Sequence, residues 1–187
     1  MKAIIIPGNG GDKPEDKWFP YVKKRLDAMN IPTENVEFPD AILARKEFWL
    51  PFIAKLGGGP DAILIGHSSG AVAAMRYAEK NKILGSVLVG VCYTDLGIQS
   101  EKDSGYYDTP WDWDAIRQNQ KWIVQFASTD DPFIPISEAR FIRDHLHTEY
   151  HEYSDKGHFM LGTKTNGAAP DIEFPELIDA IKAKIIL

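Results

Sequence analysis

Residues 62–77 read Ala-Ile-Leu-Ile-Gly-His-Ser-Ser-Gly-Ala-Val-Ala-Ala-Met-Arg-Tyr, the most informative stretch of the chain. The first four residues are apolar throughout, which predicts a buried strand, and the residues from Ala71 predict a helix. Between them lies a G-x-S-x-G sequence, which at a strand-to-helix turn presents its serine, Ser68, as a nucleophile. Gly66 and Gly70 suit such a turn because a side chain at either position would crowd it. The alternative is a glycine- and serine-rich turn without chemistry.

A serine nucleophile needs a base and a carboxylate that orients the base, and the chain has candidates for both. Asp131 follows a predicted strand at Trp122–Phe126, and His158 follows another at Glu149–Tyr153. Each residue alone is also typical of a surface loop. Their order along the chain, with each one just after a later strand, is the order expected for a catalytic triad with Ser68. Asp130 is the competing acid, and we expect it to cap a turn or the next helix instead.

The glycine-rich loop after the predicted strand Ala3–Ile6 supplies a further part of the expected site. Two backbone N–H groups must stabilise the oxyanion that forms during acyl transfer. Ser69, directly after the nucleophile, is expected to donate one, and either Asn9 or Gly10 the other. A loop of this kind is also found in nucleotide-binding proteins. However, residues 8–13 lack the last glycine of G-x-G-x-x-G, and the chain contains no G-x-x-x-x-G-K-[ST] sequence. We therefore expect no nucleotide and no other cofactor.

The whole chain alternates predicted strands with predicted helices. Strands are predicted at Ala3–Ile6, Asn35–Phe38, Ala62–Ile65, Ser86–Val91, Trp122–Phe126 and Glu149–Tyr153, and helices within 18–29, 48–56, 71–77, 137–146 and 176–186. This alternation predicts an α/β fold with a six-stranded, mostly parallel sheet covered by helices on both faces. We place the first-strand loop beside the turn at Ser68, at the switch point of the sheet. The predicted strand order is then 2-1-3-4-5-6.

The length of 187 residues predicts one domain over residues 1–187. Within it, residues 94–119 are too long for a simple crossover and predict an aromatic-rich insertion near the active site. We expect the insertion to wall a substrate pocket with Tyr106, Tyr107, Trp111 and Trp113. A small aromatic cluster packed under a surface loop is the alternative.

Composition excludes several classes of function. The 21 Lys and Arg against 27 Asp and Glu give a net charge of −6, and no basic run exists, so we expect no nucleic-acid partner. A single cysteine, Cys92, excludes an internal disulfide and a multi-cysteine zinc site. The histidines at 145, 147 and 151 lack the spacing of a known metal motif, so we expect no metal. No apolar stretch approaches the roughly 18 residues of a membrane span, and we expect a cytoplasmic protein with no membrane partner.

The motifs together resemble the retinoblastoma-binding protein 9 family of small α/β-hydrolase-fold serine hydrolases. The likeness covers residues 7–11, 44–45, 49–52, 66–70, 73–79, 104–106, 110–111, 113, 128–133 and 157–159. It implies a compact α/β-hydrolase domain without a large cap domain and a triad of Ser68, Asp131 and His158. With Ser68 as the nucleophile, we expect an esterase or amidase that cleaves a small carboxylic ester or amide through an acyl-enzyme on Ser68. A catalytically silent interaction protein of the same fold is the alternative.

Two departures from the family limit what the resemblance implies. The L-x-C-x-E segment credited with retinoblastoma-protein binding is replaced by Leu-Gly-Gly-Gly-Pro at residues 56–60, so we do not expect that partner. Residues 160–174 form a longer segment than in the family's namesake, and we expect an extra loop beside His158 that alters the pocket.

Overall fold

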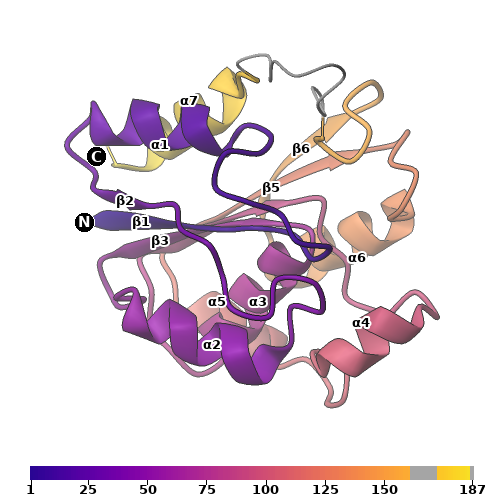
Figure 1. Cartoon of the computed structure of the whole chain (residues 1–187). Coiled ribbons are helices and arrows are strands. Elements are labelled where there is room, and N and C mark those ends of the chain that lie inside the picture. The colour runs from indigo at the N-terminus through magenta and orange to yellow at the C-terminus, as the bar shows by residue number, and fades with distance from the viewer. Residues whose placement is uncertain (161–171, 186–187) are drawn as a thin grey trace.

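A six-stranded parallel sheet lies at the centre of the computed structural model, which describes residues 1–160 and 172–185 (Figure 1). Its strands are β1 (Lys2–Ile6), β2 (Thr33–Glu34), β3 (Ala62–His67), β4 (Gly85–Val89), β5 (Ile123–Ser128) and β6 (Glu149–Tyr153). Their order is β2-β1-β3-β4-β5-β6, and every neighbouring pair is parallel. This confirms the predicted order. Most of the expected extra loop, residues 161–171, lies outside the described residues.

Helices cover both faces of the sheet, as Figure 1 shows. On one face lie α1 (Phe19–Asp27) and α7 (Pro175–Ile185), and on the other α2 (Lys46–Lys55), α3 (Ser69–Ala78), α5 (Trp113–Gln118) and α6 (Ile136–Leu146). The short helix α4 (Gln99–Ser104) lies outside both layers. This is the compact α/β-hydrolase fold, and the described residues form no large cap domain. The sequence did not predict α4 and α5, because six residues are too few to show a helical period.

The central strands β1, β3 and β4 are largely apolar because each contributes to two hydrophobic cores. Ala3 and Ile5 of β1 pack with α1 and α7, whereas Ile4 and Ile6 pack with the helices of the opposite face. Side chains of β3 and β4 alternate between the two cores in the same way. The buried runs predicted from the sequence therefore follow from a parallel sheet with both faces covered.

The second strand differs from the prediction. It spans only Thr33–Glu34, which pair with Ala3 and Ile4 of β1, and not residues 35–38. An edge strand has one neighbour, and here the chain leaves that neighbour after two residues. Phe38 then turns into the core beside α2, with ring centroids 5.1 Å from Trp49 and 4.9 Å from Phe52. Phe38 is therefore buried as a loop residue and not as part of a strand.

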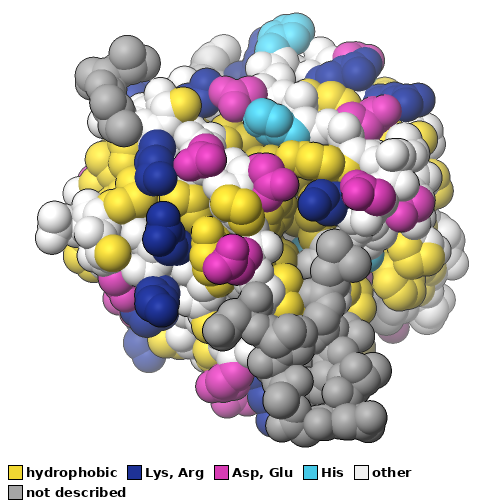
Figure 2. All heavy atoms as spheres, turned by 90° about the horizontal axis from the view of Figure 1, so that it is seen from above, with side chains coloured by type: hydrophobic (Ala, Val, Ile, Leu, Met, Phe, Trp, Pro, Cys, Tyr) yellow, Lys and Arg dark blue, Asp and Glu magenta, His cyan; other side chains and the backbone are white. Residues whose placement is uncertain are grey.

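The surface mixes charges of both signs. On the face seen in Figure 2, Lys and Arg side chains lie among Asp, Glu and apolar side chains. None of the helices in the described ranges is both long enough and apolar enough to cross a membrane.

Candidate active site

The turn between β3 and α3 holds Ser68 in a strained conformation, with φ of +54° and ψ of −121°. The Ser68 N–H donates to the carbonyl oxygen of Val89 on β4, at 2.8 Å. A Cβ on Gly66 would lie 2.4 Å from the Gly70 carbonyl oxygen, and a Cβ on Gly70 would lie 2.2 Å from that of Ile6. Both glycines are therefore required by close backbone approach, and the turn has the geometry of a nucleophile elbow.

Asp131 and His158 form a buried pair at the carboxyl ends of β5 and β6. Asp131 Oδ2 lies 2.7 Å from His158 Nδ1, and the two side chains are only 4% and 6% exposed. The other carboxylate oxygen of Asp131 accepts hydrogen bonds from the N–H groups of Phe133 and Ile134, at 2.9 and 3.0 Å. The loop after β5 thus fixes the carboxylate, which in turn orients the imidazole.

The competing acid, Asp130, points elsewhere. Its carboxylate is exposed and accepts hydrogen bonds from Ser128 Oγ at 2.5 Å and from the Gly157 N–H at 2.9 Å. The hydrogen bond from Ser128 is the main cause that lowers the pKa of Asp130. Asp130 therefore joins the two loops that precede Asp131 and His158 and makes no contact with the imidazole ring.

Ser68 and His158 both line one cavity of about 330 Å³ at the carboxyl edge of the sheet. No hydrogen bond joins Ser68 Oγ to the His158 ring in the described residues. In a site without substrate such contacts are commonly long and shorten in the complex. The cavity therefore brings together a strained serine and a carboxylate-oriented imidazole, two of the groups that acyl transfer requires.

The two candidates for the second oxyanion donor differ in the hydrogen bonds that their backbone N–H groups make. Ser69 is the first residue of α3, so its N–H has no acceptor within the helix, and both Ser69 and Asn9 line the cavity. The Gly10 N–H already donates to the carbonyl oxygen of Ile42 at 3.1 Å. The Asn9 N–H has no acceptor among the described residues, so it, and not that of Gly10, is available to a ligand.

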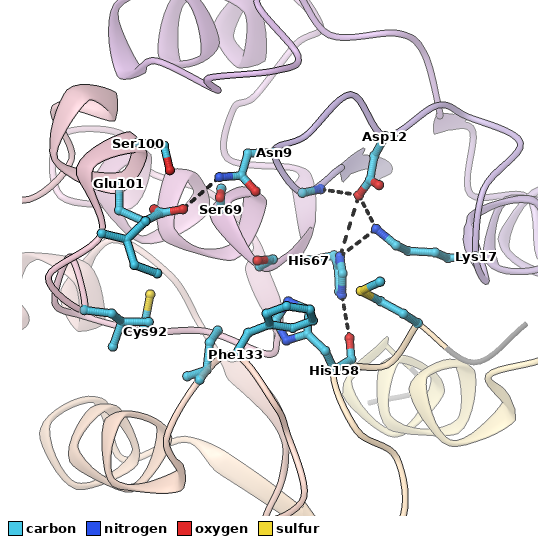
Figure 3. A pocket seen from close by; sticks show the side chains of 16 residues that line it. Asn9, Asp12, Lys17, His67, Ser69, Cys92, Ser100, Glu101, Phe133 and His158 are labelled. Atoms are coloured by element: carbon cyan, nitrogen blue, oxygen red, sulfur yellow. Dashed lines mark hydrogen bonds and ion pairs between the residues drawn. The ribbon is translucent and has the colours of Figure 1, made fainter. Parts of the chain in front are cut away.

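Glu101 of α4 holds the Asn9 side chain (Figure 3). Glu101 Oε1 accepts from Asn9 Nδ2 at 2.7 Å, and Oε2 accepts from the Tyr107 hydroxyl at 3.3 Å. Burial raises the pKa of Glu101, although the hydrogen bonds from Tyr107 and Asn9 act in the opposite direction. The sequence offered no signal for this contact, because α4 was not predicted and Glu101 is 92 positions from Asn9.

On the other wall of the cavity, Asp12, Lys17 and His67 form a linked group (Figure 3). Asp12 accepts hydrogen bonds from the Gly8 N–H, at 3.0 Å, and from the Lys17 ammonium. Lys17 Nζ lies 3.5 Å from His67 Nδ1. The residue pattern did not single out Asp12 or Lys17 as parts of the site. A charged residue inside a glycine-rich loop was the only available signal.

The four aromatic residues predicted to wall a substrate pocket do not line this cavity. Tyr106 is buried in the core, and Trp111 and Trp113 line a separate surface hollow together with residues such as His145. The Tyr107 hydroxyl contacts Cys92 Sγ at 3.2 Å, one layer behind the cavity surface. These four aromatic residues therefore pack the insertion onto the core, which was the alternative interpretation. Tertiary contacts of the insertion decide this placement, and the composition of the segment could not.

The cavity mouth is nevertheless apolar. Its apolar side chains belong to residues that no pattern in the sequence indicated. The apolar residues that line the cavity are Leu96, Ile98, Phe133, Ile134 and Met160. Ile98 is 46% exposed and Phe133 is 58% exposed, unusual values for large apolar side chains. An exposed apolar rim around a polar centre is typical of a binding site.

The described residues contain no group of three or more His, Cys, Asp or Glu arranged to hold a metal ion. Two of the clustered histidines make local contacts: His145 Nδ1 lies 2.8 Å from the Phe141 carbonyl oxygen, and His151 Nε2 lies 3.0 Å from Glu149. Burial raises the pKa of Cys92 to about 12, so the thiol stays protonated at neutral pH.

Comparison with known proteins assigns the family. The family model described as serine hydrolase matches residues 3–166. The chain belongs to the serine hydrolase family. Serine hydrolase RBBP9 from Rattus norvegicus is 40% identical over 187 residues, which cover 98% of this serine hydrolase and 95% of the relative.

Solved structures show the same fold. The crystal structure of the ydeN gene product from B. subtilis matches with a TM-score of 0.85 and 22% identity over 100% of both chains. Est1E from Butyrivibrio proteoclasticus matches with a TM-score of 0.72 and 14% identity over 99% of this serine hydrolase and 88% of that chain.

Proposed function

We propose that this serine hydrolase cleaves small carboxylic esters or amides through an acyl-enzyme on Ser68. The observation that carries the proposal is the 2.7 Å contact between His158 and Asp131 at the cavity that also contains the strained Ser68. Family membership supports hydrolysis, and the geometry supports the residues that perform it.

In the acylation half-reaction, Ser68 Oγ attacks the substrate carbonyl carbon while His158 Nε2 accepts the hydroxyl proton. Asp131 holds Nδ1–H of the same ring, which keeps the tautomer whose Nε2 is a base and stabilises the imidazolium. The carbonyl oxygen becomes an oxyanion that the N–H groups of Ser69 and Asn9 stabilise. The intermediate collapses as His158 returns the proton to the leaving alcohol or amine.

In the deacylation half-reaction, water replaces the leaving group. His158 takes one proton from the water as its oxygen attacks the acyl carbon, and a second oxyanion forms in the same place. Collapse of this intermediate breaks the bond to Ser68 Oγ and returns the proton to the serine. The products are a carboxylic acid and the free enzyme, so the reaction needs no cofactor.

The cavity supports a small substrate with an apolar part. Its volume of about 330 Å³ is at the lower end for a ligand site. Phe133 and Ile98 at the mouth would bury apolar atoms of the acyl or leaving group. A series of p-nitrophenyl esters of increasing acyl length tests this: we expect kcat/KM to peak at a short acyl chain and the Phe133→Ala variant to lose that preference.

A fluorophosphonate probe tests the nucleophile. We expect the wild-type protein to be labelled stoichiometrically and the Ser68→Ala variant not to be labelled. No labelling of the folded wild-type protein would contradict the proposal and favour a catalytically silent interaction protein.

The acid is tested by comparing Asp131→Asn with its neighbour variant Asp130→Asn. We expect the first to lower kcat by about 10⁴-fold, the size of effect seen when a triad carboxylate becomes an amide. The second removes only a contact between loops, so it should retain most of the activity. The opposite ranking would show that the acid is assigned wrongly.

A further inference from the structure

His67 lies beside the proposed nucleophile, yet its side chain contacts other parts of the site. Its ring is 1% exposed, and Nε2 lies 2.8 Å from the backbone carbonyl oxygen of His158. A carbonyl oxygen only accepts hydrogen bonds, so Nε2 must carry the proton and donate. The His67 ring therefore holds, by a hydrogen bond, the backbone of the residue that supplies the proposed base.

The other ring nitrogen connects to the opposite loop. Nδ1 of His67 faces Lys17 Nζ at 3.5 Å and the Asp12 carboxylate at 3.9 Å. Burial lowers the pKa of His67 to about 4, so the ring is neutral at pH 7 and Nδ1 is an acceptor. The Lys17 ammonium, paired with Asp12, is the donor that matches it and favours the Nε2–H tautomer.

Asp12 extends the connection to the proposed oxyanion loop. The carboxylate oxygen that pairs with Lys17 also accepts the Gly8 N–H at 3.0 Å. Gly8 directly precedes Asn9, the proposed oxyanion donor. A chain of side chains thus runs from the backbone at residue 8 through Asp12, Lys17 and His67 to the backbone at residue 158 (Figure 3).

We propose that His67 is a positioning residue for hydrolysis, tying the loop that carries His158 to the loop that carries the oxyanion donor Asn9. The proposal rests on the proposed function above. Ser68 is attached to His67 through the backbone, so one element sets the nucleophile, the base and the oxyanion donor relative to one another. Catalysis of this kind is sensitive to such spacing, and a displacement of about 1 Å can cost on the order of 10²-fold in rate.

A purely structural role for His67 makes a different prediction. A buried imidazole with both nitrogens paired also contributes to stability, and its loss would lower the melting temperature. In that case each folded molecule would keep its turnover rate. A positioning role requires that kcat of the folded protein falls while KM changes little.

The experiment compares His67→Phe with His67→Gln in ester hydrolysis, with the folded fraction measured by circular dichroism. The Phe ring fills the space but cannot donate to the His158 carbonyl, whereas the Gln amide can. We expect His67→Phe to lower kcat about 10- to 100-fold with KM within about twofold, and His67→Gln to recover a large part of the loss. If His67→Phe does not fold, His67→Asn replaces it, since its shorter amide cannot reach the carbonyl oxygen.

His145→Phe is the matched control. It also removes an imidazole that contacts a backbone carbonyl oxygen at 2.8 Å, but His145 lies away from the cavity. We expect its kcat to equal that of the wild-type protein. Equal kcat values for wild type and His67→Phe, or for the Gln and Asn variants, would overturn the positioning role. An inactive, unlabelled wild-type protein would instead overturn the proposed function.

Discussion

Gly90, the residue after β4, gives the His158 ring the space that it occupies. A Cβ at position 90 would lie 3.1 Å from Cε1 and 3.2 Å from Nδ1 of His158, and 3.8 Å from Asp131 Oδ2. Gly90 also has a φ of +58°, a backbone conformation that residues with a side chain rarely adopt. A side chain at position 90 would therefore strain the backbone and would also displace the imidazole–carboxylate pair.

We predict that Gly90→Ala lowers the free energy of unfolding by about 1 kcal/mol through backbone strain and also lowers kcat by displacing His158. Gly57→Ala is the control, because Gly57 has a φ of +88° and a new Cβ there meets only the flexible end of Lys2. Urea unfolding and ester hydrolysis are measured on both variants. Similar kcat values for the two would show that position 90 does not affect the site.

His67 makes stability depend on pH. Its pKa falls from 6.5 in the unfolded chain to about 4 in the folded protein, mainly through burial, with Asp12, Lys17 and His158 facing the ring. Between those two values the unfolded state binds the proton and the folded state does not. Stability must therefore fall as the pH drops through this window, with a slope of at most about 1.4 kcal/mol per pH unit.

We predict that the wild-type protein loses up to about 2 kcal/mol more unfolding free energy between pH 7 and pH 5 than the His67→Phe variant does. Burial acts to raise the pKa of Asp12, but the paired Lys17 ammonium outweighs it and the pKa is lowered, so Asp12 stays ionised in this range. Urea unfolding of both proteins at the two pH values measures the difference. Parallel losses would mean that His67 titrates normally.

At the scale of elements, one side chain of α3 makes several contacts with the insertion of residues 94–119. Arg76 Nε donates to the Tyr106 carbonyl oxygen at 2.7 Å, and the guanidinium also donates to those of Thr109 at 2.6 Å and Pro110 at 3.2 Å. The guanidinium lies 3.5 Å from the ring centre of Trp111. This contact pattern explains why the aromatic residues pack against the core and away from the cavity.

We predict that Arg76→Met lowers the free energy of unfolding by about 3 kcal/mol, because it leaves several partly buried carbonyl oxygens without a donor. Arg76→Lys should recover little, since one ammonium cannot reach the same three oxygens. Arg117→Met is the control, with an exposed pair to Asp114 that contributes within about 0.5 kcal/mol. Urea unfolding ranks the three variants, and an Arg76→Met stability close to that of the control would refute this account.

The insertion also reaches the site, through α4. Glu101 comes from this segment and holds the Asn9 side chain, while Leu96 and Ile98 of the same segment line the cavity. The insertion therefore contributes to the proposed oxyanion loop and to the cavity mouth. Its aromatic residues Tyr106, Trp111 and Trp113 contribute to neither.

At the scale of the whole molecule, one sheet separates two hydrophobic cores that share every central strand. Trp18 is buried in the core under α1 and α7, and Trp49 is buried in the core under α2 and α3. Because the strands contribute to both cores, loss of one core must expose the other. The single domain expected from the sequence is therefore expected to unfold as one cooperative unit.

We predict a single unfolding transition in urea, with coincident curves from tryptophan fluorescence and far-ultraviolet circular dichroism. Fluorescence reports both cores, and dichroism reports the helices and the sheet. Two separate midpoints would mean that part of the chain folds independently of the rest.

The sequence by itself determined the strand order, the layers and the positions of Ser68, Asp131 and His158. Buried strands and helices have short-range patterns, and each of these three residues lies in the turn or loop that follows a strand. In a parallel sheet such positions meet at one edge, so a one-dimensional pattern was enough to bring them together.

Only the tertiary structure decided which other residues surround these three. Within the described part of the chain, the Asn9 N–H has no acceptor, whereas the Gly10 N–H donates to Ile42 from a distant segment. Asp12, Lys17 and His67 became one group, and Glu101 a partner of Asn9, through contacts that leave no local pattern. The physical reason is that a hydrogen bond between segments far apart in the chain depends on where both segments pack, whereas strand and helix periods depend on near neighbours alone.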